Sequence, residues 1–325
     1  MEVTIHGMQP ALSGGGNLFA DAGEQMVRDY ASQAKAANTL RAYAADWRHF
    51  TAWCRSHSAA ALPAPPVAVS VYLAELAATV RVSTITRRIS AISQAHQLAG
   101  YASPTAAAAV RTVLAGIRRA KGVAPRMKKP ILLDDLRTML EGLPDNRIGL
   151  RDRALLLLGF AGGFRRSELV GLDWEDIEFT AEGAIVTIRR SKTDPEGQGR
   201  RLGIPHGRNA TTCPVRALRA WSAAAGKADG AVFLPLDRHG KLGARRLSDR
   251  AVARIVKRSL PEDRYNPADY AGHSLRAGLA TCAAMEGASE RSIMRQTGHR
   301  SLAVLRHYIR EGTLFRENAA ATTGL

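Results

Sequence analysis

Apolar residues recur at three- and four-residue intervals through most of residues 38–121, and this spacing predicts a succession of amphipathic helices. The apolar stripe of the clearest helix consists of Leu40, Tyr43, Trp47, Phe50 and Trp53 or Cys54. Asn38 is the predicted N-cap of this helix, and the proline-rich segment 62–66 ends it. Ser83 is the predicted cap of a later helix that ends at Gly100. Further helices are expected at 21–35, 67–79 and 104–121, so residues 21–122 are predicted to form a small all-helical domain.

The pattern changes from residue 131 onward, where one stretch has the character of strands. Residues 184–188 alternate and are rich in β-branched side chains, and 201–205 can return beside them. The segment 192–199 between them is rich in turn residues, so a β-hairpin is expected. Asp134 is the predicted cap of the first helix of this region. Helices are expected at 134–140, 151–160, 214–225, 248–259, 274–285, 290–297 and 301–309.

The two regions are joined by a basic segment, residues 123–130, which holds two prolines and the cations Arg126, Lys128 and Lys129. Such a composition is typical of a solvent-exposed linker. It could follow a DNA backbone or serve as a tether without contacts. The predicted organisation is therefore a flexible tail at 1–20, a helical domain at 21–122, a linker at 123–130 and a second domain at 131–325.

Charge points to the class of partner. Lysine and arginine number 46 against 29 aspartates and glutamates, which gives a formal net charge of +17 and a pI of about 10.6. An excess of this size favours a polyanion, because release of counterions from phosphates supplies much of the binding free energy. A ribosomal protein or one that binds a membrane surface is the alternative.

Other features of the composition limit the cellular setting. The three cysteines, Cys54, Cys213 and Cys282, are widely separated and odd in number, which fits neither a disulfide framework nor a zinc cluster. The longest apolar run, residues 154–164, is too short to span a bilayer, and residues 1–16 lack the pattern of a signal peptide. A cytoplasmic protein without a membrane segment is expected.

The candidate chemistry centres on Tyr308. A tyrosine hydroxyl has a pKa of about 10 and is a poor nucleophile at neutral pH, so it would need neighbouring cations and a proton acceptor. Arg165 follows a glycine pair at the end of an apolar helix, and Arg276 lies three positions after His273, one helical turn away. A guanidinium fork suits two phosphate oxygens, although Arg165 alone could equally form an ion pair with Glu168.

Six motif residues follow one another in this order: Arg165 within Gly-Phe-Arg-Arg-Ser-Glu-Leu (163–169), Lys192 within Arg-Arg-Ser-Lys-Thr (189–193), His273 with Arg276, His299 after Gly298, and Tyr308, nine positions after His299. This set and its order resemble those of the tyrosine recombinases, the phage-integrase and Xer-like family of DNA strand exchangers. Lys192 is also the only lysine between Lys129 and Lys227. The segments 38–43 and 84–89 resemble the family's core-binding domain, so the likeness covers nearly the whole chain after residue 20.

The resemblance implies a mechanism. Tyr308 would attack the scissile phosphodiester to give a 3′-phosphotyrosyl enzyme and a free 5′ hydroxyl. Arg165 and Arg276 would neutralise the nonbridging oxygens, where charge builds in the transition state. Lys192 would protonate the departing 5′ oxygen, and His273 would act as acid and base toward the tyrosine.

The resemblance assigns further residues and a fold. His299 would form a hydrogen bond with a phosphate oxygen, and Glu168 would orient Arg165 and His273. No metal, cofactor or ATP is implied. The expected fold is mainly α, with an N-terminal all-helical, SAM-like core-binding domain and an α+β catalytic domain of the DNA breaking-rejoining type. The residues expected to contact DNA are Arg41, Arg87, Arg88, Arg118, Arg119, Lys121, Lys128 and Arg166.

The implied partner is double-stranded DNA with paired inverted half-sites, bound by a homotetramer, with scope for accessory DNA-bending proteins, in the cytoplasm at the nucleoid. Leu314 and Phe315 would anchor the tail after Tyr308 on a neighbouring subunit or on its own domain. Two alternatives stay open. A type IB topoisomerase shares the chemistry and relaxes supercoils as a monomer, and a non-catalytic DNA-binding protein could use the same fold.

Overall fold

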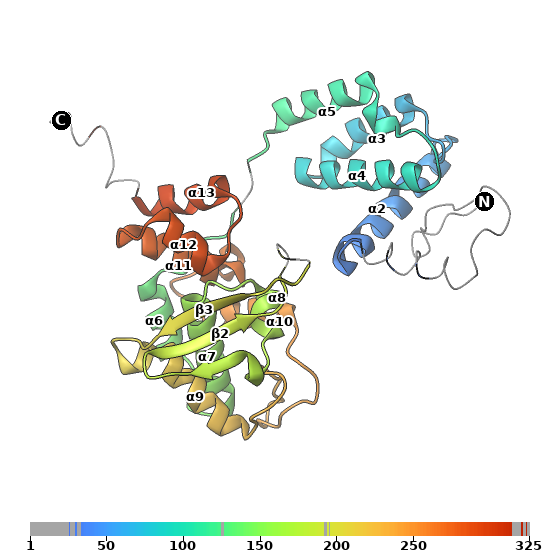
Figure 1. The fold of residues 1–325 in the computed structure, drawn as a ribbon. Helices are drawn as coiled ribbons and strands as arrows, with labels where there is room; N and C mark the ends of the chain where they lie inside the picture. Colours follow the sequence, from blue (N-terminus) through green and yellow to red (C-terminus); the bar gives the residue numbers. More distant parts are fainter. Residues whose placement is uncertain are drawn as a thin grey trace. The chain divides into compact units, whose positions relative to one another are not determined.

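The computed structural model describes residues 34–124, 127–191, 194 and 196–313, with the backbone alone for 310–313, and the isolated positions 26, 30, 320 and 323. The chain divides into two compact units, residues 1–126 and 127–325 (Figure 1). Most of the helix predicted over 21–35, together with Lys192, Leu314 and Phe315, lies outside the described residues.

Unit 1 contains helices and no strand within its described residues. These are α2 (Ala37–Ser56), α3 (Pro66–Thr79), α4 (Val82–Leu98) and α5 (Ala108–Lys121), with a short 3₁₀ turn at Pro104–Ala106. Helix α2 packs on α4, and α3 packs on α5, around one apolar core. That core is built from the predicted helical stripes and includes Trp47, Phe50, Cys54, Val69, Tyr72, Leu73, Ile85, Ile92, Val110 and Ile117.

Two predicted caps in unit 1 are wrong. Helix α2 begins at Ala37, with Ala36 in the cap position, and Asn38 lies inside the first turn, where its side chain accepts a hydrogen bond from Arg41 at 2.5 Å. Helix α4 begins at Val82 rather than after Ser83. Neither helix has a side-chain cap. Both can do without one, because burial of the apolar face stabilises a helix in a folded protein more than the cap does.

Unit 2 combines helices with one three-stranded antiparallel sheet, in the order β1 (Ile177–Phe179), β2 (Gly183–Ile188) and β3 (Arg200–Pro205). The predicted hairpin is β2–β3, which pairs from Gly183 opposite Pro205 to Ile188 opposite Arg200. The short strand β1 was not predicted. The described helices of this unit are α6 (Leu133–Glu141), α7 (Arg147–Ala161), α8 (Arg166–Gly171), α9 (Pro214–Ala225), α10 (Asp249–Arg258), α11 (His273–Met285), α12 (Glu290–Thr297) and α13 (Leu302–Thr313).

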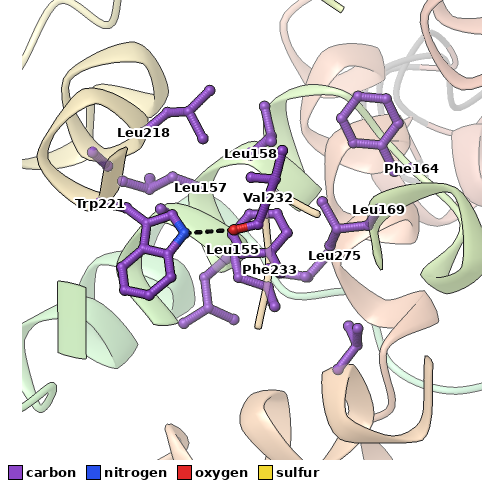
Figure 2. Close-up of a cluster of buried hydrophobic side chains, with 14 of the residues drawn as sticks. Leu155, Leu157, Leu158, Phe164, Leu169, Leu218, Trp221, Val232, Phe233 and Leu275 are labelled. Carbon is purple, nitrogen blue, oxygen red and sulfur yellow. Dashed lines mark hydrogen bonds between the residues drawn. The ribbon is translucent and has the colours of Figure 1, made fainter. Parts of the chain in front are cut away.

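Helix α7 runs through the main core of unit 2. Its leucines pack against α9, and the Trp221 side chain on α9 is fully buried while its Nε1 donates to the Val232 carbonyl at 2.7 Å (Figure 2). The predicted beginnings of two helices need correction. Helix α7 starts at Arg147, four residues before Arg151, and the Asn146 side chain caps it. Asp134 is not a cap, because it lies inside α6, which has Leu132 in the cap position. The carboxylate of Asp135 instead accepts from the Leu132 backbone at the start of α6.

Helices α11, α12 and α13 lie against one another (Figure 1). A second, smaller apolar cluster of unit 2 holds them together. Small residues on α11, namely Ala277, Ala280 and Ala284, leave room for Leu305 and Tyr308 of α13. Tyr308 is therefore fixed by packing on the helix that also carries Arg276.

The predicted fold class is confirmed: in its described residues the chain is mainly helical, with a helical first unit and a small antiparallel sheet in the second. Among the described residues, no helix is long and apolar enough to cross a membrane.

Candidate active site

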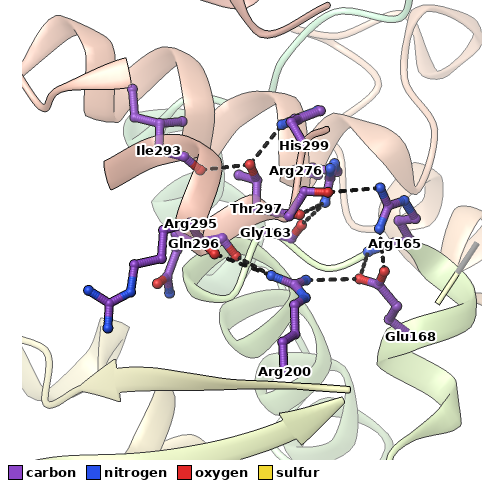
Figure 3. Close-up of polar contacts among 11 residues, drawn as sticks. Gly163, Arg165, Glu168, Arg200, Arg276, Ile293, Arg295, Gln296, Thr297 and His299 are labelled. Atoms are coloured by element: carbon purple, nitrogen blue, oxygen red, sulfur yellow. Dashed lines mark hydrogen bonds and ion pairs between the residues drawn. The ribbon is translucent and has the colours of Figure 1, made fainter. Parts of the chain in front are cut away.

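Arg165 occupies the cap position of α8, directly after the turn that ends α7. Gly163 in that turn has φ +55°, a conformation that favours glycine. The Glu168 carboxylate accepts from the Arg165 backbone N–H at 2.9 Å and from its Nη1 at 2.5 Å. Nη2 of Arg165 donates to the Gly298 carbonyl at 3.1 Å (Figure 3). The ion pair with fully buried Glu168 thus orients the guanidinium toward the segment that carries His299.

Arg276 is 2% exposed, and its Nη1 donates to the Gly163 carbonyl at 2.7 Å and to the Thr297 carbonyl. Burial lowers the pKa of Arg276 to about 10, and the positive charge of Arg165 acts in the same direction. The guanidinium therefore stays charged at neutral pH. Its Nε–H is buried without a hydrogen-bond partner within the described part of the chain.

His299 is held by Thr297. The Thr297 hydroxyl donates to the Ile293 carbonyl at 2.7 Å and also lies 2.7 Å from His299 Nδ1 (Figure 3). Because the one hydroxyl hydrogen is directed at the carbonyl, Nδ1 must be the donor to the Thr297 oxygen, and Nε2 then carries a lone pair. Burial lowers the pKa of His299 to about 3, assisted by the charges of Arg276 and Arg165. The imidazole is neutral at neutral pH.

Tyr308 is 6% exposed, and its ring centroid lies 5.9 Å from that of His299 with the planes tilted by 40°. Burial lowers the pKa of Arg276, and the negative charge that Tyr308 acquires on ionisation opposes that effect. His273 is the exposed first residue of α11, one turn before Arg276, and its charge contributes to the low pKa of His299. The described part of the site therefore brings Arg165, Arg276, His299 and Tyr308 together.

Arg200 is a cation of this site that the sequence analysis did not single out. Its Nη2 lies 3.3 Å from Glu168, and its Nη1 donates to the Gln296 carbonyl at 2.9 Å (Figure 3). Arg200, Gly298 and His299 also line one open cavity of about 170 Å³. The available signal was strand alternation, since Arg200 shares the inward face of β3 with Leu202 and Ile204.

The residues expected to contact DNA fall into two groups. Arg87 donates to both carboxylate oxygens of buried Asp46, at 2.7 and 3.0 Å, and Arg88 lies 3.6 Å from the same group with its side chain only 13% exposed. Arg88 therefore has an intramolecular role within unit 1. The other predicted contacts have exposed or partly exposed side chains: Arg41, Arg118, Arg119, Lys121, Lys128, and Arg166, which lies 3.7 Å from Asp249.

Comparison with known proteins gives the family. The profile of the phage integrase family matches residues 130–313. The chain is 41% identical over 291 residues to the integrase/recombinase xerD homolog of Selenomonas ruminantium, covering 88% of this chain and 85% of that relative. It is 25% identical over 306 residues to the recombinase cre of Escherichia phage P1, covering 88% and 87% of the two chains.

Solved structures agree on the fold. The XerH site-specific recombinase in its post-cleavage complex with a palindromic difH substrate superimposes with a TM-score of 0.64, at 16% identity, over 94% of this chain and 85% of that one. A lambda integrase dimer bound to a COC′ core site gives a TM-score of 0.59, at 16% identity, over 89% and 93% of the two chains. Taken with the family profile and the sequence relatives, these findings show that the chain belongs to the phage integrase family and is a tyrosine-type site-specific recombinase that acts on DNA.

Proposed function

We propose that this recombinase cleaves DNA through Tyr308. The phenolic oxygen attacks the scissile phosphorus, an O–P bond to Tyr308 forms, and the bond from phosphorus to the 5′ oxygen breaks. The phenol loses its proton and the 5′ oxygen gains one, which leaves a 3′-phosphotyrosyl enzyme and a 5′ hydroxyl. The observation that carries the proposal is the position of Tyr308, which is packed beside His299 and coupled to the buried charge of Arg276.

Arg165 and Arg276 are proposed to bind the nonbridging oxygens of the scissile phosphate. Both are held in place by the protein before DNA arrives, Arg165 by Glu168 and Arg276 by two backbone carbonyls. Charge that is preorganised in a buried site stabilises a transition state more than the same charge in water.

His299 fits the role of a hydrogen-bond acceptor, rather than that of a donor to a phosphate oxygen. With Nδ1 donating to Thr297, its Nε2 is an acceptor, so it would receive a hydrogen bond from the Tyr308 hydroxyl or from a protonated phosphate oxygen. To donate to an unprotonated phosphate oxygen, as the family resemblance implies, the Thr297 hydroxyl would have to turn away from the Ile293 carbonyl. The arrangement of Thr297 therefore favours the acceptor role.

Lys192 and His273 complete the proposed reaction. Lys192 supplies the proton to the 5′ oxygen, and His273 exchanges a proton with the tyrosine. For His273 the support is its place one turn before Arg276 on α11. For Lys192 it is the place in the sequence between β2 and β3, whose hairpin brings Arg200 to the site.

The exposed cations are proposed to hold the DNA. Arg118, Arg119 and Lys121 lie together at the C-terminal end of α5, and Lys128 is the second residue of unit 2. Most such contacts go to phosphates and give position rather than sequence. Because one tyrosine cuts one strand, we propose that a homotetramer acts on paired inverted half-sites, with or without DNA-bending proteins. It would work in the cytoplasm, at the nucleoid.

Covalent trapping tests the proposal. Wild type, Tyr308→Phe and the control Tyr101→Phe are incubated with nicked duplex fragments that tile the source genome, including the DNA around the protein's own gene, and are then denatured. Tyr101 is a suitable control because it is an exposed tyrosine of unit 1. We expect a DNA-linked band for wild type and Tyr101→Phe and none for Tyr308→Phe. Absence of an adduct in wild type, or its persistence in Tyr308→Phe, would overturn the proposal.

A further inference from the structure

Arg200 is a largely buried cation for which the proposed reaction has no role. Its side chain is 23% exposed, and burial lowers its pKa, while the Glu168 carboxylate opposes that effect. The neighbouring Arg201 points to the other face of β3 and forms an exposed ion pair with Glu178 at 3.0 Å. A buried arginine on the inward face of a strand is costly unless its donors are used.

The Nη1 and Nη2 donors of Arg200 join three elements that are distant in sequence, while its Nε–H is buried without a hydrogen-bond partner among the described residues. From β3, Nη2 reaches Glu168 on α8 at 3.3 Å, and Nη1 reaches the carbonyls of Gln296 at 2.9 Å and Arg295 at 3.4 Å on α12 (Figure 3). The last carbonyls of a helix have no partner within the helix, and a cation near them is favourable. The guanidinium therefore caps α12 and contacts Glu168 at the same time.

Gly298, between α12 and His299, lies directly against this guanidinium. It has φ +68°, and a Cβ at this position would lie 2.8 Å from the Arg200 Cζ. The carbonyl of the same glycine accepts from Arg165 Nη2 at 3.1 Å. Arg165 and Arg200 thus hold one turn from two sides, and Glu168 contacts both of them. That turn leads straight into His299.

We propose that Arg200 is a positioning residue, whose planar fork fixes the turn at Gly298 and the carboxylate of Glu168 so that His299 and Arg165 face the scissile phosphate. The inference rests on the proposed function and adds a residue to it. A lysine would keep the positive charge but not the fork, since a single ammonium cannot reproduce the planar, two-sided geometry of a guanidinium.

Single-turnover cleavage at saturating DNA tests this role, with the duplex recovered from the trapped wild-type adduct as substrate. The variants are Arg200→Lys, Arg200→Gln and the matched control Arg201→Gln, which removes the same charge from the exposed face. We expect the rate to fall by about 100-fold in Arg200→Gln and by at least about 10-fold in Arg200→Lys, because small displacements of the reacting groups are costly. The rate of Arg201→Gln and the DNA affinity of all three should stay within about threefold of wild type.

The outcomes separate the possible roles. A wild-type rate in Arg200→Lys would overturn the inference, because charge alone would then suffice. The inference would also be overturned if the Arg200 variants cleaved saturating DNA at the wild-type rate but melted at a lower temperature. Arg200 would then have a role in folding alone. If Arg200→Gln does not fold, the lysine variant decides. Failure of the proposed function is distinct, because wild type itself would then form no adduct at Tyr308.

Discussion

Each unit of this recombinase contains a buried carboxylate that pairs with two arginines. The two clusters differ in their net charge and in the partners of their arginine donors. In unit 1, the Asp46 carboxylate accepts hydrogen bonds from both Nε and Nη2 of Arg87, and Arg88 lies 3.6 Å from the same carboxylate. These ion pairs link α2 to α4. In unit 2, Glu168 contacts Arg165 and Arg200, and Arg276 lies close enough for all three charges to influence its pKa.

The difference lies in the balance of charge and in the use of the donors. The fork of Arg87 is directed at Asp46, and Nη1 of Arg88 contacts Tyr72 and His49, whereas Arg276 is held by two backbone carbonyls. Arg88 and Arg276 each have a buried Nε–H without a hydrogen-bond partner among the described residues. The unit 2 cluster, defined as Glu168 with Arg165, Arg200 and Arg276, holds three positive charges against one negative charge, whereas two arginines face Asp46 in unit 1. Similar residues thus produce a structural link in one unit and, in the proposed function, an anion site in the other.

The largest contrast should appear when an arginine is removed from each cluster. Arg276→Gln is expected to lower the single-turnover cleavage rate at saturating DNA by at least about 100-fold, because a buried donor to the transition state is lost. Arg87→Gln should leave that rate within about threefold of wild type. Rapid-quench assays of strand cleavage measure both. A large loss in both variants would show that the two clusters are not functionally different.

Removing the carboxylate of unit 1 should affect stability instead. Asp46→Asn leaves the cations of Arg87 and Arg88 without their partner, so the free energy of unfolding of unit 1 should fall by about 2 kcal/mol. Partial exposure of Arg87 keeps the loss below the range for a fully buried pair. Urea titration of the chain measures it. The control Glu178→Gln, which breaks an exposed pair, should change stability by less than about 0.5 kcal/mol. An equal effect of the two changes would contradict the structural role of Asp46.

The pH dependence of stability should also differ between the two clusters, through His299 in unit 2 and His49 in unit 1. The expected change in the free energy of unfolding is smaller than that for Asp46→Asn. The folded-state pKa of His299, about 3, lies below its usual value, so its neutral form stabilises the protein above the unfolded pKa and that contribution is lost as pH falls toward 3. Burial and Arg88 also lower the pKa of His49 in unit 1, but Asp46 opposes them there.

His299→Gln should therefore reduce the loss of unfolding free energy between pH 7 and pH 5 by about 1 kcal/mol. His49→Gln should reduce it by less. Urea titrations at the two pH values provide the measurement. A larger effect at His49 would contradict the difference in charge balance.

Much of the fold and of the site could be predicted from local sequence. The helical stripes around Trp47 and Ile85 and the alternation at 184–188 defined the core and the hairpin, because burial determines those patterns. The ends of helices were less predictable. Asn38 and Ser83 have the side chains of caps, but tertiary packing placed the helix starts elsewhere.

Of the motif residues, Arg165, Arg276, His299 and Tyr308 lie together in the described part of the chain, and Arg165 contacts Glu168 within one helical turn. Arg200 was not predicted because its role depends on the pairing register of β3 and on contacts with α8 and α12, which are distant in sequence. Arg88 looked like a surface cation because its partner Asp46 lies on another helix. Pairing across elements is not visible in a single linear pattern.

In the proposed function, Arg165 and Arg276 act on the charge of the scissile phosphate, and the mechanism depends on this role. It is tested most directly by cleaving matched substrates that carry either the normal phosphate or a neutral methylphosphonate at the scissile position, with wild type and Arg276→Gln. If Arg276 neutralises phosphate charge, the loss caused by Arg276→Gln should shrink from about 100-fold on the phosphate to less than about 10-fold on the methylphosphonate. An equal loss on both substrates would contradict the claim and reduce Arg276 to a structural role.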